Sequence, residues 1–76
     1  MRKKYGKEAN LIASYEKYAK IRDEHGYTDY RVAKETGIGA ATLSDWKNKL
    51  TRPKIDKLYL IAMLFDVALE DLCEEG

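Results

Sequence analysis

The chain has 76 residues, of which 45% are hydrophobic and 36% charged, so it fits one folded domain and has no room for a second core. Its longest apolar run, residues 58–65, is far too short to cross a bilayer, and no apolar segment follows the basic start as it would in a secretory signal. A single cysteine excludes an intrachain disulfide and, with only one histidine, speaks against a zinc site. We therefore expect a cytoplasmic protein with no metal, cofactor, small-molecule ligand or membrane contact.

The net charge of +1 conceals an uneven distribution along the chain. Residues 1–57 contain all 14 Lys and Arg residues, whereas residues 58–76 contain none and carry five acids. A nearly neutral protein can still present a basic face and an acidic end. We expect residues 1–8 to form a basic N-terminal arm.

The spacing of apolar residues predicts an all-α fold. A first helix is expected over residues 9–25, ended by Gly26. Its apolar stripe recurs at steps of three and four residues, at Leu11, Tyr15, Tyr18 and Ile21.

A second, short helix is expected to begin after Thr28, whose side chain suits an N-cap, with Asp29 in its first turn. Val32 and Ala33 face inward, and Gly37 ends the helix. A third helix follows over residues 40–48, with Leu43 and Trp46 on its inner side. The last two helices are expected over residues 54–65 and 69–74.

The fourth predicted helix is apolar on every side. Its expected core stripe consists of Ile55, Leu58, Ala62 and Phe65. Four further apolar residues lie off that stripe: Tyr59, Leu60, Met63 and Leu64. Either the first helix and the N-terminal arm cover them, or they form a candidate dimer seam, since exposed apolar patches usually mark partner sites.

Gly37-Ile38-Gly39 superficially suggests a phosphate-binding loop. Such a loop needs a preceding strand and further motif residues, whereas here a helix precedes it and no Lys-Ser/Thr follows. A turn between two helices fits better. Nor do Ser14, Ser44 and Cys73 have partners for a catalytic triad, so we do not expect an enzyme and predict no catalytic residue.

A short helix, a glycine turn and a second short helix form the helix-turn-helix pattern, in which the second helix enters the DNA major groove. The stretch "TDYRVAKETGIGAATLSDWKNK" (28–49), followed by "RPKIDKLYLIAMLFDVALEDL" (52–72), resembles the DNA-binding domain of the phage repressor and Cro (XRE) family. The resemblance implies a five-helix, lambda-repressor-like domain spanning residues 1–76. Its helix-turn-helix occupies residues 29–48, its C-terminal helices occupy residues 54–75, and it binds double-stranded operator DNA as a homodimer.

The resemblance also assigns contacts. With Leu43 and Trp46 inward, the outward side of the third helix meets base edges through Ala40, Ala41, Thr42, Ser44 and Asp45. The DNA backbone would be contacted by Arg22, Lys47, Asn48, Lys49, Arg52 and Lys54. The alanine methyls can pack on thymine methyls, and Asp45 can accept from a cytosine amino group.

The chain departs from the family at six positions. Lys47 stands where an acid often pairs with Arg22, so Arg22 is either free for phosphate or has another partner. Asp29 replaces a glutamine and would repel phosphate. Gly39 stands where Ser or Thr is common, so a hydroxyl contact to the backbone is lost. The remaining changes lie at helix ends: Ala68 stands where a capping Ser is usual, and Lys49 and Asp66 replace glycines.

Two functions remain. The first is a sequence-specific transcriptional regulator, a repressor of phage or mobile-element type. The second is a protein-interaction module on the same fold, such as an antitoxin, whose acidic last third and apolar fourth helix hold a basic partner.

Overall fold

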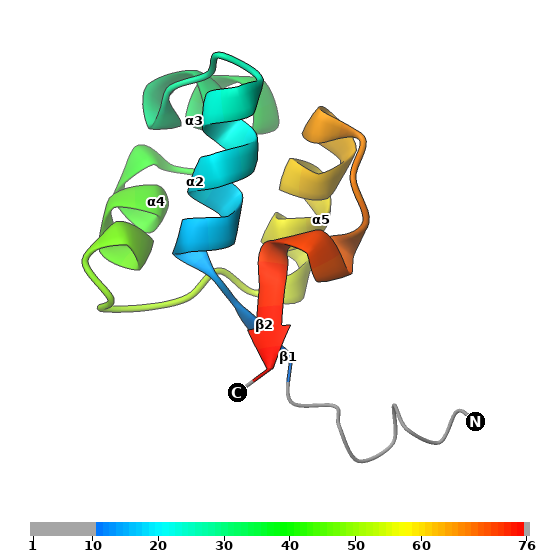
Figure 1. Ribbon diagram of the computed structural model, residues 1–76. Helices are drawn as coiled ribbons and strands as arrows, with labels where there is room; N and C mark the ends of the chain where they lie inside the picture. The colour runs from blue at the N-terminus through cyan, green and yellow to red at the C-terminus, as the bar shows by residue number, and fades with distance from the viewer. Residues whose placement is uncertain (1–10, 76) are drawn as a thin grey trace.

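The computed structural model describes residues 11–75 (Figure 1). The predicted basic arm, residues 1–8, therefore lies outside the described residues. Within them the helices are α2 (Tyr15–Glu24), α3 (Asp29–Thr36), α4 (Ala40–Lys47), α5 (Ile55–Phe65) and the 3₁₀ helix η1 (Leu69–Leu72). The strands are β1 (Leu11–Ala13) and β2 (Cys73–Glu75). The all-α helix-turn-helix class is confirmed, although the described residues form four α-helices rather than five.

The first helix begins later than the sequence predicts. Ser14 is its N-cap, and the Ser14 Oγ accepts a hydrogen bond from the Lys17 N–H at 3.2 Å. The residues just before it form β1, so placing Leu11 on a helical stripe was wrong. A strand of three residues is too short to show alternation, which explains why the sequence pattern does not reveal it.

The last predicted helix, residues 69–74, is also shorter than expected. It is the 3₁₀ helix η1, and the chain then extends into β2, which pairs antiparallel with β1. Leu11 lies opposite Glu75 and Ala13 opposite Cys73, while the Ser14 N–H donates to the Leu72 carbonyl at 2.8 Å. This two-stranded ribbon joins the two ends of the described region.

The turns of the helix-turn-helix follow local rules. The Thr28 Oγ1 caps α3 by accepting from the Arg31 N–H at 3.1 Å, and Gly37 ends α3 with φ of 81°. Gly39 precedes α4 as an N-cap without a side-chain hydrogen bond. Its φ is −62°, and an added Cβ would meet only the Thr42 hydroxyl, at 3.9 Å, so the turn does not require glycine at this position.

The other predicted departures at helix ends are confirmed. Lys49 has φ of 62° and Asp66 has φ of 56°, which non-glycine residues adopt at a cost. Ala68 provides no side-chain cap to η1, but the Asp71 carboxylate accepts from the Ala68 N–H at 3.1 Å.

The core receives at least one fully buried side chain from each of α2, α3, α4, α5 and η1. Figure 1 shows α2 between α4 on one side and α5 on the other, with α3 across one end. The largest fully buried side chains are Tyr18, Val32, Leu43, Ile61 and Leu72. The half formed by α3 and α4 and the C-terminal half therefore share one core, and α2 is its centre.

The inner side of α5 is largely as predicted. Leu58, Ala62 and Phe65 are buried. Ile55, predicted to be in the core, is instead 68% exposed, because it is the first residue of α5 and lies beside an open cavity lined by β1, α5 and η1. Of the candidate seam residues, Leu64 packs partly against the core. The exposed apolar side chains of α5 are Ile55, Tyr59, Leu60 and Met63.

Candidate nucleic-acid interface

The outward side of α4 is set by two buried residues. Leu43 is fully buried and Trp46 is 3% exposed, and these side chains orient the helix. On the opposite side Ala40, Ala41 and Ser44 are exposed, while Thr42 and Asp45 are half-buried. Ala40, Ala41, Ser44 and Asp45 therefore face away from the core, while Thr42 lies at the edge of the buried side, four residues before Trp46.

Exposed cations follow directly after this surface. Lys47 ends α4, and the connection to α5 contains Lys49, Arg52 and Lys54. These four cations are exposed, and so is Asn48. The Lys49 Nζ lies 3.4 Å from the Glu16 Oε2, and both side chains are more than 70% exposed. Such an exposed pair is weak and leaves the ammonium available to an anion.

Arg22, the sixth predicted backbone contact, is held inside the protein. Its side chain is 17% exposed, and its Nη1 donates to the Asp29 Oδ1 at 2.8 Å and to the Tyr15 hydroxyl at 2.9 Å. Its Nε and Nη2 both donate to the Asp23 Oδ1. The sequence left two alternatives open for Arg22, a free side chain that contacts phosphate or a side chain with another partner. In the structure Arg22 has other partners, namely Asp29, Tyr15 and Asp23.

Asp29 is the centre of this polar cluster. Its two carboxylate oxygens accept hydrogen bonds from the hydroxyls of Tyr15 and Tyr18, each at 2.7 Å, in addition to the bond from Arg22. Burial alone would raise the pKa of Asp29, but the hydrogen bonds from Tyr18, Tyr15 and Arg22 outweigh burial and lower the pKa below its ordinary value. The carboxylate that was expected to repel phosphate is instead neutralised by Arg22 at the start of α3.

The same tyrosines pack on α4. The ring of Tyr18 stacks on that of Trp46 with centroids 5.0 Å apart, and the Tyr15 ring meets Trp46 edge-on at 5.5 Å. Burial, followed by the hydrogen bond to Asp29, raises the pKa of the Tyr18 hydroxyl. Tyr15 and Tyr18 therefore fix α3 and α4 to the same surface of α2.

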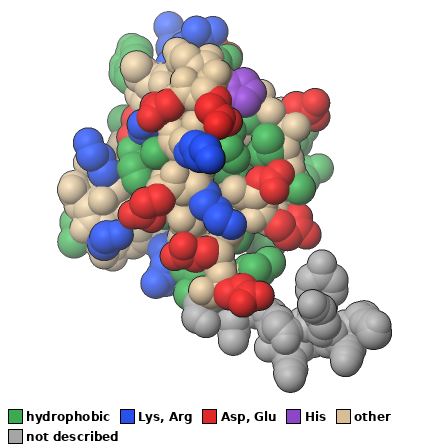
Figure 2. Space-filling model, viewed as in Figure 1, with side chains coloured by type: hydrophobic (Ala, Val, Ile, Leu, Met, Phe, Trp, Pro, Cys, Tyr) green, Lys and Arg blue, Asp and Glu red, His purple; other side chains and the backbone are tan. Residues whose placement is uncertain are grey.

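Charge is divided across the molecule. In the view of Figure 2, Asp and Glu side chains lie over η1 and the ribbon, while acidic and basic side chains alternate over the middle of the molecule. The acids of the C-terminal region are Asp66, Glu70, Asp71, Glu74 and Glu75, all exposed.

A family model described as helix-turn-helix matches residues 19–72, about two thirds of the chain. The chain belongs to the helix-turn-helix family, of the XRE type. It is a DNA-binding regulator of that type. Comparison with curated proteins and with solved structures finds no significant match.

In this helix-turn-helix protein α3 and α4 are the first and second helices of the motif. Their connection, residues 37–39, is a turn between helices and follows no strand, as the sequence indicated. Among residues 11–75 no helix is long and apolar enough to span a membrane, and no three His, Cys, Asp or Glu side chains group as metal ligands.

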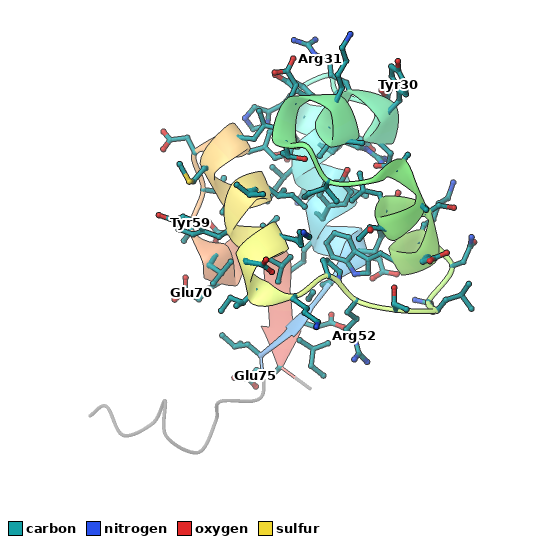
Figure 3. The ribbon with its side chains drawn as sticks, turned by 180° about the vertical axis from the view of Figure 1, so that it is seen from behind. Tyr30, Arg31, Arg52, Tyr59, Glu70 and Glu75 are labelled. Atoms are coloured by element: carbon teal, nitrogen blue, oxygen red, sulfur yellow. The ribbon has the colours of Figure 1, made fainter. Side chains whose placement is uncertain are left out.

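Sequence reasoning missed the role of two residues that support the helix-turn-helix, Tyr15 and Tyr18. Tyr15 and Tyr18 were assigned only to an apolar stripe, although Arg22 follows Tyr18 at i+4 and Tyr15 at i+7, on the same side of α2. Tyr30 was not singled out, yet it is 72% exposed in the first turn of α3 (Figure 3). The spacing of the tyrosines and Arg22 was the available signal for the polar cluster.

Proposed function

We propose that the protein is a repressor of phage or mobile-element type that acts in the bacterial cytoplasm and binds operator DNA as a homodimer. The observation that supports this most directly is the outward side of α4. Two buried anchors, Leu43 and Trp46, leave its small and polar residues exposed, and exposed cations follow at its C-terminal end. A helix of this kind fits the major groove, with the cations on flanking phosphates.

Four cations are available for phosphate contact: Lys47, Lys49, Arg52 and Lys54. If all four neutralise phosphates, the logarithm of the binding constant falls with the logarithm of salt concentration with a slope of about −3.5 per copy. Arg22 contributes little in this proposal, because four of its N–H groups are engaged within the protein.

Base selection is assigned to the polar members of the α4 surface. Asp45 accepts from the amino group of cytosine, Ser44 and Thr42 contribute hydroxyls, and the methyls of Ala40 and Ala41 pack on thymine. Selection of preferred duplexes from a random pool identifies the operator. In Asp45→Asn the preferred base at one position is expected to change from cytosine to adenine, because an amide both donates and accepts.

The backbone contacts are tested by anisotropy titrations of a labelled operator between about 50 and 200 mM salt. Lys49→Ala should weaken binding to all sequences equally and flatten the salt slope by about one unit per copy. Because Lys and Ala pay a similar cost at positive φ, the change removes charge without relieving the backbone. Lys57→Ala, an exposed lysine on α5, is the matched control and should leave the slope unchanged. A change in the preferred sequence in Lys49→Ala would contradict its placement on the backbone.

The alternative, an antitoxin-like interaction module, is favoured by a different observation. The five exposed acids of the C-terminal region adjoin the exposed apolar residues of α5, which suits a basic, partly apolar partner. The titrations separate the two functions. Absence of binding to any duplex at low salt would favour the interaction module, whereas salt-dependent binding with sequence preference supports the repressor.

A further inference from the structure

A cavity of about 300 Å³ lies between the start of α2 and the connection from α4 to α5, beside the ribbon. Part of its lining is apolar: Ile12 and Ala13 come from β1, and Leu50, which is 71% exposed, comes from the connection. Figure 3 shows Arg52, which also lines the cavity, projecting from that connection. The volume is at the lower end of the range for ligand pockets, so the cavity suits a molecule smaller than a typical drug.

The indole of Trp46 borders this cavity and supplies a hydrogen-bond donor. The side chain is 3% exposed, and within residues 11–75 its Nε1–H donates to no acceptor. A buried donor without an acceptor is costly, and almost all such groups bond to protein, water or a ligand. Because the indole borders open space here, the cavity is the place where an acceptor for this N–H can lie.

Charged side chains of both signs surround the cavity. Lys49 and Arg52 line it from the connection, whereas Glu16 lines it from α2 and Glu74 from β2. The Lys49 Nζ and the Glu16 Oε2 lie 3.4 Å apart in an exposed pair, which is weak. Among residues 11–75 Arg52 and Glu74 form no ion pair, so the cavity has one cation for a carboxylate and one carboxylate for an ammonium group.

These charges select the class of ligand. An anion without an ammonium group would be repelled by the two carboxylates, and a cation without a carboxylate would be repelled by the two basic side chains. A small molecule that carries both groups pairs with Arg52 and with Glu74. Its carboxylate can also accept from the Trp46 Nε1–H, and an apolar side chain can pack on Ile12 and Leu50. A free amino acid with an apolar side chain has these groups.

We infer that this cavity binds a free amino acid with an apolar side chain, and that the bound ligand opposes operator binding. The ligand carboxylate lies on Arg52 and the Trp46 Nε1–H, and its ammonium group lies on Glu74. The opposing effect rests on the proposed function, in which Arg52 and Lys49 contact phosphates, and it is reciprocal, since DNA must weaken ligand binding by the same factor. The sequence led us to expect no small-molecule ligand, because the segments that form the cavity are far apart in the chain.

The first test uses the fluorescence of Trp46, the single tryptophan, in the full chain without DNA. The probes are L-leucine, L-methionine and L-phenylalanine. At least one should change the emission saturably, with a dissociation constant of about 1 mM or below. The controls for each probe are the acid that lacks its ammonium group and the amine that lacks its carboxylate, and each should bind about 10-fold more weakly or worse. No saturable change with any probe would overturn the inference, and so would a control that binds as tightly as its amino acid.

Variants test where the ligand lies. Arg52→Gln and Glu74→Gln should each raise the dissociation constant of the probe by about 10-fold or more, because each removes a charged partner. Lys54→Gln and Glu75→Gln are the matched controls: they remove the same charges from exposed neighbours that do not line the cavity, and they should change the constant less than about twofold. Thermal melts by circular dichroism confirm that the four variants fold. Equal effects in the variants and their controls would overturn the site.

Anisotropy titrations of a labelled operator, with and without saturating probe, test the effect on DNA. The probe should weaken operator binding by about 10-fold or more and flatten the salt slope by about one unit per copy, because Arg52 is then engaged. Operator binding that the probe leaves unchanged would overturn the opposing effect. A protein that binds the probe but no duplex would contradict the proposed repressor function and leave the ligand site intact.

Discussion

The helices α4 and α5 differ in what they present to the solvent. Both bury one side in the shared core, α4 through Leu43 and Trp46 and α5 through Leu58, Ile61, Ala62 and Phe65. The outward side of α4 is small and polar, whereas that of α5 carries exposed Ile55, Tyr59, Leu60 and Met63. Both helices therefore bury an apolar inner side, but their outer surfaces differ: that of α4 suits a groove in DNA, and that of α5 suits contact with protein.

The two helices also differ in how they are held. The helix α4 is held by a mixed aromatic and polar support, in which Trp46 packs on the tyrosines that bind Asp29. Within residues 11–75, α5 is held by the packing of Leu58, Ile61, Ala62 and Phe65 in the core. A polar cluster fixes orientation more narrowly than apolar packing does, because its hydrogen bonds are directional. We expect the geometry of the half formed by α3 and α4 to depend on that cluster.

Removal of the Trp46 side chain should have the largest effect. Trp46→Ala deletes a 3%-exposed aromatic residue that contacts Tyr15 and Tyr18, and it should lower the free energy of unfolding by about 3–5 kcal/mol. Ser44→Ala, on the outward side of the same helix, should change it by less than about 0.5 kcal/mol. Urea denaturation followed by circular dichroism measures both. Equal losses of unfolding free energy in the two variants would contradict the division of α4 into a buried side that stabilises the fold and an exposed side that does not.

The polar cluster should make stability depend on pH. Asp29→Asn should cost about 1–3 kcal/mol at neutral pH, because it weakens charge-assisted hydrogen bonds from Tyr15, Tyr18 and Arg22. The pKa of Asp29 is lower in the folded state than its ordinary 3.8, so this stabilisation is present above about pH 4 and is lost as the pH falls through the folded value.

Denaturation of Asp29→Asn and wild type across this pH range should therefore show a difference that shrinks in acid. Asp23→Asn is the matched control, since Asp23 also accepts from Arg22 but its side chain is 66% exposed. If both variants behave alike, the cluster contributes no more than an exposed ion pair.

The smallest expected effects concern the two glycines of the turn. Gly39→Ser should stabilise the protein by about 0.5–1 kcal/mol, because it adds an N-cap hydroxyl to α4 and restricts the unfolded chain. Gly37→Ala should destabilise it by about 1 kcal/mol, because only glycine adopts φ of 81° without cost. Thermal melts should show shifts of opposite sign. A loss in Gly39→Ser would mean that the start of α4 does not accept a capping side chain.

Much of this fold could be predicted from the sequence because its signals are local. Caps at Thr28 and Gly37, and the inward pair Leu43 and Trp46, are set within a few residues, and the structure has them where the sequence placed them. The ribbon could not be predicted, because β1 and β2 are each three residues long and lie at opposite ends of the described chain. The exposure of Ile55 followed from the same cause, since the space beside it is shaped by those strands.

The candidate site could be predicted in its outline but not in its internal partners. The exposure of Ala40, Ala41 and Ser44 follows from helical periodicity once the inner side is known. The engagement of Arg22 by Asp29 and Tyr15 depends on how α2 and α3 pack, which no spacing within one helix specifies. Contact of these residues with DNA stays a prediction.

The ribbon has a practical consequence for work with this protein. Leu11 and Glu75 lie opposite each other across it, so a fluorophore attached to either of these two residues enters the same space. That space adjoins a cavity of about 310 Å³, which Leu11, Ala13 and Cys73 help to line. Labels are therefore better placed at an exposed side chain elsewhere, such as Lys34 on α3, and tags are better removed before the association of copies is measured.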